Sequence, residues 1–194
     1  TLKAIIQRLD QGVGKVLRTL EETGRADEAL VIFCCDNGAY PIAASNAPFR
    51  GHASALFEGG IHVACMARWP GRLPVGQITD RQTLTFDLTA SILAAAGCRA
   101  PDRPLDGIDI LGQIARGTFP EPRTLFWRSR RADRTWKAVR QGDLKYVRRQ
   151  DGEQLDEYLF DLAHDPGESD NLLRTRPKDA QQLKRQLDEW EKQF

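Results

Sequence analysis

The sequence predicts an α/β fold, in which helices and a mainly parallel sheet are followed by a small antiparallel sheet and a C-terminal helix. An apolar helical stripe precedes an unbroken apolar run near the N-terminus, and short strand-like runs separated by turn residues fill the last third. A helix followed by a buried strand is typical of α/β sheets, whereas closely spaced strands pair antiparallel. We place the boundary at Gly117, within the Pro- and Gly-rich connecting stretch Arg99–Arg123, which gives domains 1–117 and 118–194.

The first domain opens with apolar residues at helical spacing. The stripe is Leu2, Ile5, Ile6, Leu9, Val13, Val16, Leu17 and Leu20. It predicts an amphipathic helix. Ala29–Cys35 then indicates a strand buried on both faces, and Ile61–Ala67 a second short strand. Thr85 or Asp87 caps a further helix, which Gly97 ends.

The second domain is predicted to be an antiparallel sheet with a helix across it. Its expected strands are Leu125–Arg128, Trp136–Arg140, Leu144–Val147 and Glu157–Leu162. Turn residues separate these runs and leave no room for helices between them. A final amphipathic helix begins at Pro177, a residue favoured in the first turn. Trp127, Trp136 and Trp190 have the spacing of core residues under that helix.

Composition narrows the class of partner. The formal net charge is +1, which argues against nucleic acid or an anionic membrane. No apolar run approaches the roughly 20 residues of a membrane span. The Arg128–Arg134 cluster includes Asp133 and is interpreted as a solvated loop. The chain starts at Thr1 inside a helical pattern, so we expect a processed chain or a fragment, whose compartment the sequence leaves undetermined.

Four cysteines are too few for a disulfide scaffold in a chain of 194 residues. Cys34 and Cys35 are neighbours on an expected strand, so their side chains point to opposite faces. Cys65 and Cys98 lie in apolar sequence. We interpret all four as small buried hydrophobic residues, because free cysteine is among the most buried residue types.

Asp36, Asn37 and Gly38 follow the apolar strand at its carboxyl end, where open parallel sheets bind ligands. A carboxylate beside an amide oxygen offers hard donors for calcium or magnesium. The same residues are also common in plain turns. From spacing alone, both interpretations stay open.

Four blocks carry a resemblance to a known family. They read DEALVIFCCDNG, NAPFRGHASALFEGGIHVACMARWPG, WKAVRQGDLKYV and YLFDLAHDPGESDNL. In order and spacing the chain resembles the C-terminal half of the sulfatases, within the alkaline-phosphatase-like superfamily. The resemblance covers nearly the whole chain, from Leu2 to the last helix.

The resemblance implies hydrolysis of a small-molecule sulfate ester at a divalent metal, usually Ca²⁺, with Asp36 and Asn37 among its ligands. The family's nucleophile is a formylglycine, made from Cys or Ser in a Cys/Ser-x-Pro/Ala-x-Arg motif. No such motif occurs here, so we expect it in an upstream N-terminal half and expect this chain alone to be inactive. A chain lacking that half is expected to self-associate or to pair with it.

The second block departs from the family at Ala53, where a sulfate-binding Lys is usual. Loss of such a cation costs on the order of 10²–10³ in rate. His52 is a weak candidate to compensate and is otherwise a solvent-exposed loop residue. Arg50 is a weak candidate for the anion pocket, and a surface or ion-pair role is the alternative. Glu58, with the two glycines after it, is interpreted as fixing the loop.

Two rival functions stay open. One is a phosphonate monoester or phosphodiester hydrolase of the same superfamily, since loss of the Lys fits a changed anion. The other is a non-catalytic, sulfatase-like binding module. His62, which replaces the usual Arg, is interpreted as a structural change, and His164 as an exposed turn residue.

Overall fold

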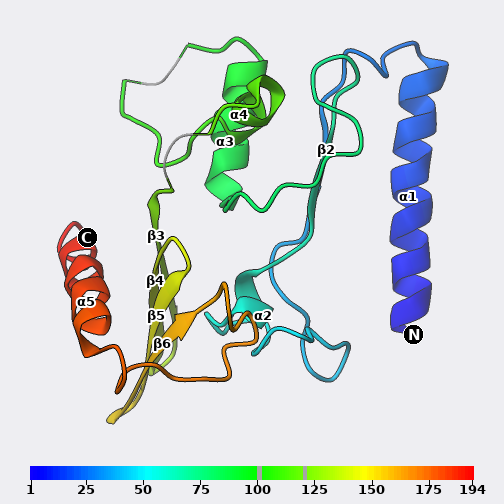
Figure 1. Cartoon of the computed structure of the whole chain (residues 1–194). Coiled ribbons are helices and arrows are strands. Elements are labelled where there is room, and N and C mark those ends of the chain that lie inside the picture. Colours follow the sequence, from blue (N-terminus) through cyan, green and yellow to red (C-terminus); the bar gives the residue numbers. More distant parts are fainter. Residues whose placement is uncertain (100–101, 120–121) are drawn as a thin grey trace. The chain divides into compact units, whose positions relative to one another are not determined.

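A computed structural model of the chain describes residues 1–99, 102–119 and 122–194. The chain forms two compact units (Figure 1). The first unit comprises Thr1–Phe33 and Met66–Glu121, and the second comprises Cys34–Cys65 and Pro122–Phe194. Within the described ranges, no helix has both the length and the apolar content needed to span a bilayer.

Helix α1 spans Leu2–Glu22, as the apolar stripe predicts. None of its residues is buried, and five members of the stripe are exposed. These are Leu2, Ile5, Ile6, Leu9 and Val16. The helix therefore forms with its apolar side open to solvent in this chain.

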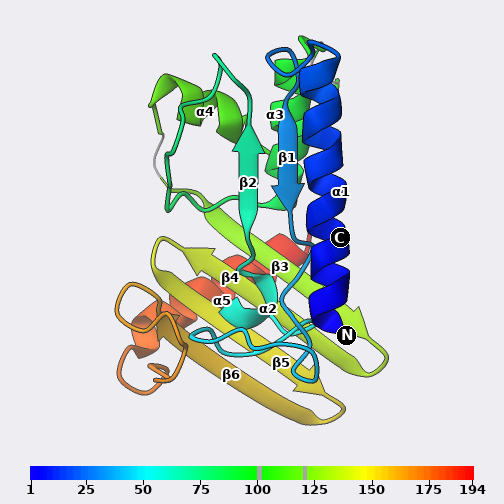
Figure 2. The ribbon, with the colours of Figure 1, turned by 90° about the vertical axis from the view of Figure 1, so that its right-hand side faces the viewer.

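Strands β1 (Val31–Cys34) and β2 (Cys65–Arg68) pair with each other. Their arrows run in opposite directions in Figure 2. The flanking hydrogen bonds agree, since Cys35 N–H donates to the Ala64 carbonyl at 3.0 Å and Gly38 N–H to that of Gly60 at 2.9 Å. The pairing is antiparallel, and the mainly parallel sheet expected for the first domain stays a prediction.

Burial of these strands differs from the prediction. Every residue of β1 is half-buried, so the strand expected to be buried on both faces is not. Cys34 and Cys35 are half-buried, while Cys65 and Cys98 are exposed. The interpretation of all four cysteines as buried residues is therefore wrong, because an apolar sequence neighbourhood does not guarantee a covering layer.

Helix α3 spans Thr85–Ala95, and its N-cap is Leu84 rather than the predicted Thr85 or Asp87, with Asp87 in the first turn. Leu84 N–H donates to Asp87 Oδ2 at 2.7 Å, and Ile108 N–H donates to Oδ1 at 3.0 Å. The fully buried carboxylate thus starts the helix and also fixes the later segment that precedes α4.

Helix α4 (Ile110–Arg116) lies in the stretch Arg99–Arg123 that the sequence assigns to a connection. Asp109 caps it by accepting a hydrogen bond from Gly112 N–H at 2.8 Å, and Gly117 ends it in a left-handed conformation. In a stretch this rich in Pro and Gly, Asp109 and Gly117 do not stand out in the sequence as capping residues. Residues 100–101 and 120–121 of that stretch lie outside the described residues.

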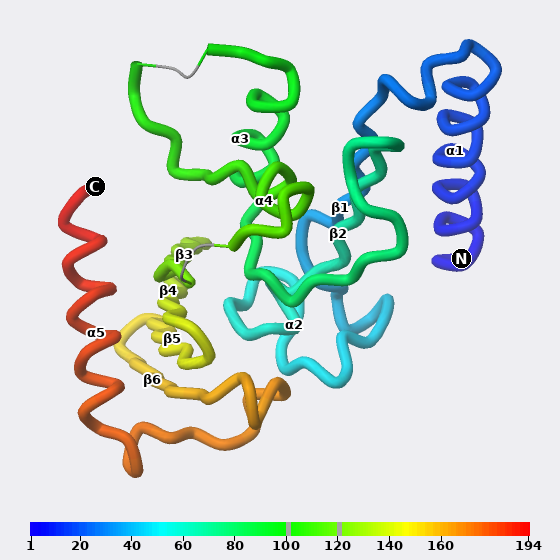
Figure 3. Tube along the Cα trace, turned by 45° about the horizontal axis from the view of Figure 1, so that its top comes forward, coloured from blue at the N-terminus to red at the C-terminus, as the bar shows by residue number. Residues whose placement is uncertain are grey.

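The second unit contains the predicted antiparallel sheet, and its four strands follow one another in chain order. They are β3 (Thr124–Arg131), β4 (Arg134–Gln141), β5 (Leu144–Asp151) and β6 (Gln154–Asp161). Two-residue turns connect them, with Gly142 and Gly152 at positive φ. Figure 3 traces the succession from β3 to the last helix, α5 (Pro177–Glu191).

The sheet packs on both faces. On one face, Val139, Tyr146 and Leu159 contact Ala180, Leu183 and Leu187 of α5. On the other, Trp136, Ala138, Val147 and Phe160 cluster with the segment Ala55–Phe57. Trp190 stacks on Phe126 at 5.2 Å on the α5 side.

The three tryptophans are therefore divided between the two faces. Trp136 is buried with Phe57, and Trp127, paired with Ala138 across the ladder, packs against the same cluster. The expectation that all three lie under the last helix holds only for Trp190, because side chains alternate faces along a strand.

Candidate functional site

The loop that follows β1 carries the predicted metal ligands. Asp36 and Asn37 are both exposed, and Asn37 N–H donates to Asp36 Oδ1 at 3.0 Å. At the next position, a Cβ added to Gly38 would lie 1.8 Å from the Gly59 carbonyl oxygen. Only glycine fits there, and the backbone after Asn37 lies directly against the Glu58-Gly59-Gly60 turn.

That turn forms the short helix α2 (Glu58–Ile61), which the sequence does not predict. A Cβ on Gly59 would lie 2.5 Å from the Arg50 carbonyl oxygen, and one on Gly60 would lie 2.2 Å from that of Ala55. Both neighbours are backbone atoms, which cannot move aside cheaply. The two glycines therefore let three segments of the loop meet.

Glu58 anchors α2 in a buried cluster of charges. Lys145 of β5 places its Nζ 2.7 Å from Glu58 Oε1 and 2.9 Å from Glu168 Oε1. The Lys145 and Glu168 side chains have no exposed surface, and that of Glu58 is 6% exposed. The second Glu168 oxygen accepts from Glu58 N–H at 2.6 Å. A cation and two carboxylates thus join the loop, the sheet and the segment after β6.

The surroundings shift the two carboxylates in opposite directions. Burial acts to raise the pKa of Glu58, but the hydrogen bond with His62 and the charges of Lys145 and Arg140 outweigh it and lower this pKa to about 2. For Glu168, burial prevails over the charge of Lys145 and raises the pKa. Glu58 is therefore the carboxylate that holds its negative charge most firmly.

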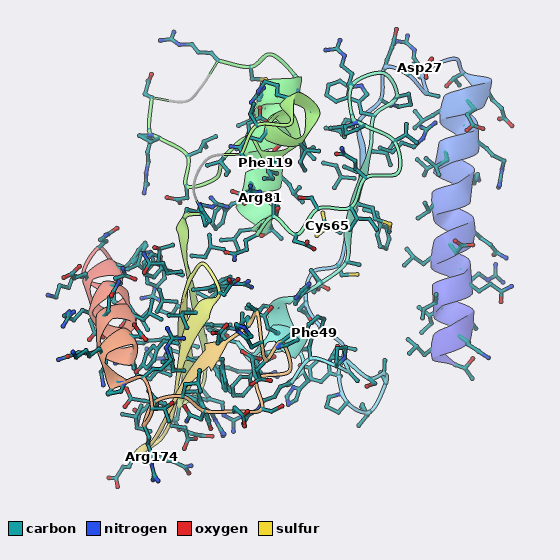
Figure 4. All side chains as sticks on the ribbon, viewed as in Figure 1. Asp27, Phe49, Cys65, Arg81, Phe119 and Arg174 are labelled. Atoms are coloured by element: carbon teal, nitrogen blue, oxygen red, sulfur yellow. The ribbon has the colours of Figure 1, made fainter. Side chains whose placement is uncertain are left out.

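Histidine and arginine residues complete this cluster. His62 Nδ1 lies 3.1 Å from Glu58 Oε2, and its ring stacks on Phe49 at 4.4 Å. Arg140 lies 3.7 Å from the same carboxylate. Figure 4 draws these side chains and labels Phe49. His62 thus contacts Glu58, the residue that holds α2 in the buried cluster.

Arg50 lies among aromatic rings. Its guanidinium stands 4.2 Å from the Phe57 ring centroid and donates to the Glu168 carbonyl at 3.0 Å. The weak candidate for the anion pocket therefore has a packing partner and a hydrogen-bond partner within the second unit.

Ala53 is buried, at 2% exposure, and its N–H donates to the Ala39 carbonyl at 3.3 Å. The next residue, Ser54, has a positive φ of 75°. His52 is exposed and stacks on Tyr40 at 6.4 Å. Hydrogen bonds with Ser54 and Arg131, and the charge of Arg131, lower the pKa of Tyr40. Arg131, Tyr40 and Ser54 thus form a cationic, aromatic and hydroxyl-bearing surface next to the buried methyl group of Ala53.

Asp36 and Asn37 suit a hard cation in donor chemistry, since both present oxygen atoms to solvent. They are two donors where calcium takes six to eight. In the described part of the chain, no cluster of three or more His, Cys, Asp or Glu side chains is arranged to hold a metal. These residues therefore fit part of a calcium site.

Sequence reasoning missed Lys145 and Glu168 as partners of Glu58. Both fall inside the blocks that carry the family resemblance, Lys145 in WKAVRQGDLKYV and Glu168 in YLFDLAHDPGESDNL. The signal was the presence of charged residues in blocks with no evident chemistry of their own. His164, by contrast, is exposed as expected, with 86% of its side chain in solvent.

The comparisons of sequence match this chain to one family. The family profile described as Sulfatase matches residues 4–98. Bovine (Bos taurus) arylsulfatase A is 32% identical over 194 aligned residues, covering 87% of this chain and 38% of the relative. Human (Homo sapiens) N-acetylgalactosamine-6-sulfatase is 33% identical over 129 residues, covering 63% of this chain and 25% of the relative. The chain thus spans well under half of these relatives.

Solved structures share the fold. Ps i-CgsB, solved in complex with k-i-k-neocarrahexaose, matches with a TM-score of 0.83 and 23% identity over 93% of this chain and 40% of its own. A protein solved with its substrate D-glucosamine-2-N,6-O-disulfate matches with a TM-score of 0.79 and 18% identity, over 97% and 39%. The likeness to these structures shows the fold, and the matched profile and the curated relatives show that the chain belongs to the sulfatase family.

Proposed function

We propose that this chain is part of a sulfuric ester hydrolase and supplies two ligands, Asp36 and Asn37, to a divalent metal site. The observation that carries the proposal is the placement of these exposed residues on a loop braced by a buried charge cluster. Gly38 N–H donates to the Gly60 carbonyl of α2 at 2.9 Å. Glu58, the first residue of α2, forms an ion pair with Lys145 at 2.7 Å. Such bracing preorganises ligands.

Ca²⁺ is the metal that the donor set favours, because carboxylate and amide oxygens are hard ligands. When bound, the ion would supply positive charge that stabilises the sulfate oxygens during ester cleavage. The Asp36 carboxylate and Asn37 amide oxygen would hold it. The remaining ligands and the formylglycine nucleophile belong to the expected N-terminal half, so this chain alone is proposed to be inactive.

The positive charge of Arg131, the last residue of β3, supports binding of an anionic substrate near the loop that carries Asp36 and Asn37. Ala53 offers only a buried methyl group where a cation would face the sulfate. Arg131 has no carboxylate partner among the ion pairs of the described residues, and its positive charge helps to lower the pKa of Tyr40. Its charge is therefore available to an anion near Tyr40 and His52. We propose that the parent enzyme acts on a small-molecule sulfate ester.

A calcium titration followed by amide NMR tests the proposed ligands on this chain as it exists. Because two donors make a partial site, we expect saturable shifts of the Asp36 and Asn37 signals in the millimolar range. Asp36→Ala is expected to abolish them. Asp10→Ala, on the exposed face of α1, is the matched control and is expected to leave them unchanged. No saturable shift at Asp36 would contradict the metal site and favour a non-catalytic binding module.

Activity assays separate the remaining alternatives. An aryl sulfate and an aryl phosphonate ester, tested side by side, are both expected to show no turnover with this chain alone. Addition of an N-terminal half from a sulfatase relative is expected to restore sulfate cleavage selectively. Preferential cleavage of the phosphonate would instead support the related phosphonate or phosphodiester hydrolase, for which the loss of the cation at Ala53 is the motivating observation.

A further inference from the structure

We propose that Cys34 and Cys65 form a reversible disulfide that closes the loop carrying Asp36 and Asn37. The two residues end β1 and begin β2, the paired strands. Cys35 N–H donates to the Ala64 carbonyl at 3.0 Å, and this antiparallel register sets Cys34 opposite Cys65. Facing residues on antiparallel strands have Cα atoms about 4.5–5.5 Å apart, within the range that a disulfide spans.

The contact between the two side chains supports the same pair. The two thiols are near enough to influence each other, since burial and the neighbouring Cys34 thiol raise the pKa of Cys65 to about 11. Cys65 is exposed and Cys34 half-buried, so a small oxidant has access to one member of the pair. Cys34 and Cys65 are both free cysteines in this structure.

The other cysteines fit this role less well. Cys35 adjoins Cys34 on an extended segment, and neighbouring side chains there point to opposite faces, so Cys35 faces away from Cys65. Cys98 lies beyond the end of α3, outside the paired strands β1 and β2. The pair that the strand register selects is thus one of several that four cysteines allow.

The reaction requires an oxidant, and the proposal names a small-molecule disulfide such as oxidised glutathione. One protein thiolate attacks its S–S bond, forms a mixed disulfide and expels one glutathione thiolate. The second protein thiolate then attacks the bound protein sulfur and expels the other. The protein loses two electrons and two protons, which the two released glutathione thiols carry away.

The bond would enclose residues 35–64, which include Asp36, Asn37, Ala53 and Glu58. Linking the ends of this segment restricts the unfolded chain, and an unstrained bridge stabilises the folded one. Oxidation is therefore expected to raise the midpoint of thermal unfolding by roughly 5–10 °C, a shift that dithiothreitol reverses. The redox state would thus set the rigidity of the loop that carries the proposed ligands.

Peptide mapping of the oxidised chain tests the assignment. The chain is incubated with oxidised glutathione, alkylated without reduction and digested with trypsin. The expected product joins residues 26–50, which contain Cys34 and Cys35, to residues 51–68, which contain Cys65. Fragmentation of this product is expected to place the bond on Cys34. Two of the four thiols remain open to alkylation.

Serine variants provide the controls. Cys34→Ser and Cys65→Ser are expected to abolish the linked peptide, while Cys35→Ser and Cys98→Ser leave it intact. Full alkylation of all four thiols after oxidation would overturn the proposal, and so would a bond placed on Cys35. Because the peptide map of the unaltered chain locates the bond by itself, the assignment to Cys34 and Cys65 is tested even where a variant fails to fold.

Discussion

The ammonium group of Lys145 lies 2.7 Å from a carboxylate oxygen of Glu58, and this contact joins the four-stranded antiparallel sheet to the loop of the candidate site. The Lys145 side chain has no exposed surface. Glu168, 2.9 Å away, is its second carboxylate partner. Burying an amino group this completely is costly unless carboxylates pair with it, so the three residues act as a unit.

Replacing the lysine tests that unit. Lys145→Met keeps a similar length but leaves two buried carboxylates without their cation, so we expect a loss of about 3–5 kcal/mol in the free energy of unfolding. Chemical denaturation measures it. Lys178→Met, at an exposed position of α5, is the matched control, with an expected change within about 0.5 kcal/mol. Equal effects of the two variants would contradict a structural role for the buried cluster.

The depressed pKa of Glu58 predicts a pH dependence. Its folded-state pKa of about 2 lies below its ordinary 4.5, so its contribution to stability is present above pH 4.5 and is lost as the pH falls toward 2. A shift of this size corresponds to about 3 kcal/mol. Unfolding of the unaltered chain and of Glu58→Gln is expected to differ most near neutral pH and to converge in acid.

A matched control for the pH series is Glu21→Gln, because Glu21 lies on the exposed helix α1. Its stability is expected to follow that of the unaltered chain at every pH. A gap between Glu58→Gln and the unaltered chain that stayed constant from pH 7 to pH 2 would show that the Glu58 charge is not stabilised by its neighbours.

The sequence predicts the second unit well because local signals determine it. Turn residues such as Gly142 mark where strands reverse, and Pro177 marks the first turn of the last helix. The antiparallel sheet and that helix are confirmed. The faces were harder to predict, since Trp136 turns away from α5 toward Phe57, a residue about eighty positions earlier in the chain.

The candidate site was predictable only in its local part. Asp36 and Asn37 stand out as polar residues after an apolar strand, and the structure places them at the surface. Lys145 does not stand out, because nothing around it indicates that its partner is Glu58. Long-range ion pairs leave no periodic pattern in a sequence. The buried cluster of Glu58, Lys145 and Glu168 is therefore visible only in the structure.

The glycines of α2 give a third prediction. In Gly60→Ala the new methyl carbon would lie 2.2 Å from the Ala55 carbonyl oxygen and 2.6 Å from that of His52. Because both are backbone atoms, we expect a loss of more than about 2 kcal/mol in unfolding free energy. The calcium-dependent shifts of Asp36 are also expected to weaken, since Gly60 accepts from Gly38 N–H.

The control for this change is Gly12→Ala in the middle of α1, where an added Cβ has nothing within 4 Å. Alanine favours helix over glycine, so this variant is expected to gain up to about 1 kcal/mol. If Gly60→Ala were as stable as the unaltered chain, the close backbone approach seen around α2 would not be required for folding.

The exposed stripe of α1 predicts that two copies of the chain associate. Ile5 is 67% exposed, Ile6 55% and Leu9 53%, which together form an apolar strip on one side of a long helix. Burying such a strip against the same strip of a second copy removes apolar surface from water. Sedimentation velocity is expected to show a concentration-dependent dimer. The double variant Ile5→Lys and Leu9→Lys is expected to shift it to monomer.

The matched control adds the same two charges on the opposite side of the helix, as Gln7→Lys with Gln11→Lys. Both positions are exposed and lie outside the apolar stripe, so the dimer is expected to persist. Loss of the dimer in both double variants would assign the effect to net charge, and a monomer at every concentration of the unaltered chain would contradict the association itself. Retention in the control and loss in the stripe variant places the contact on the apolar face of α1.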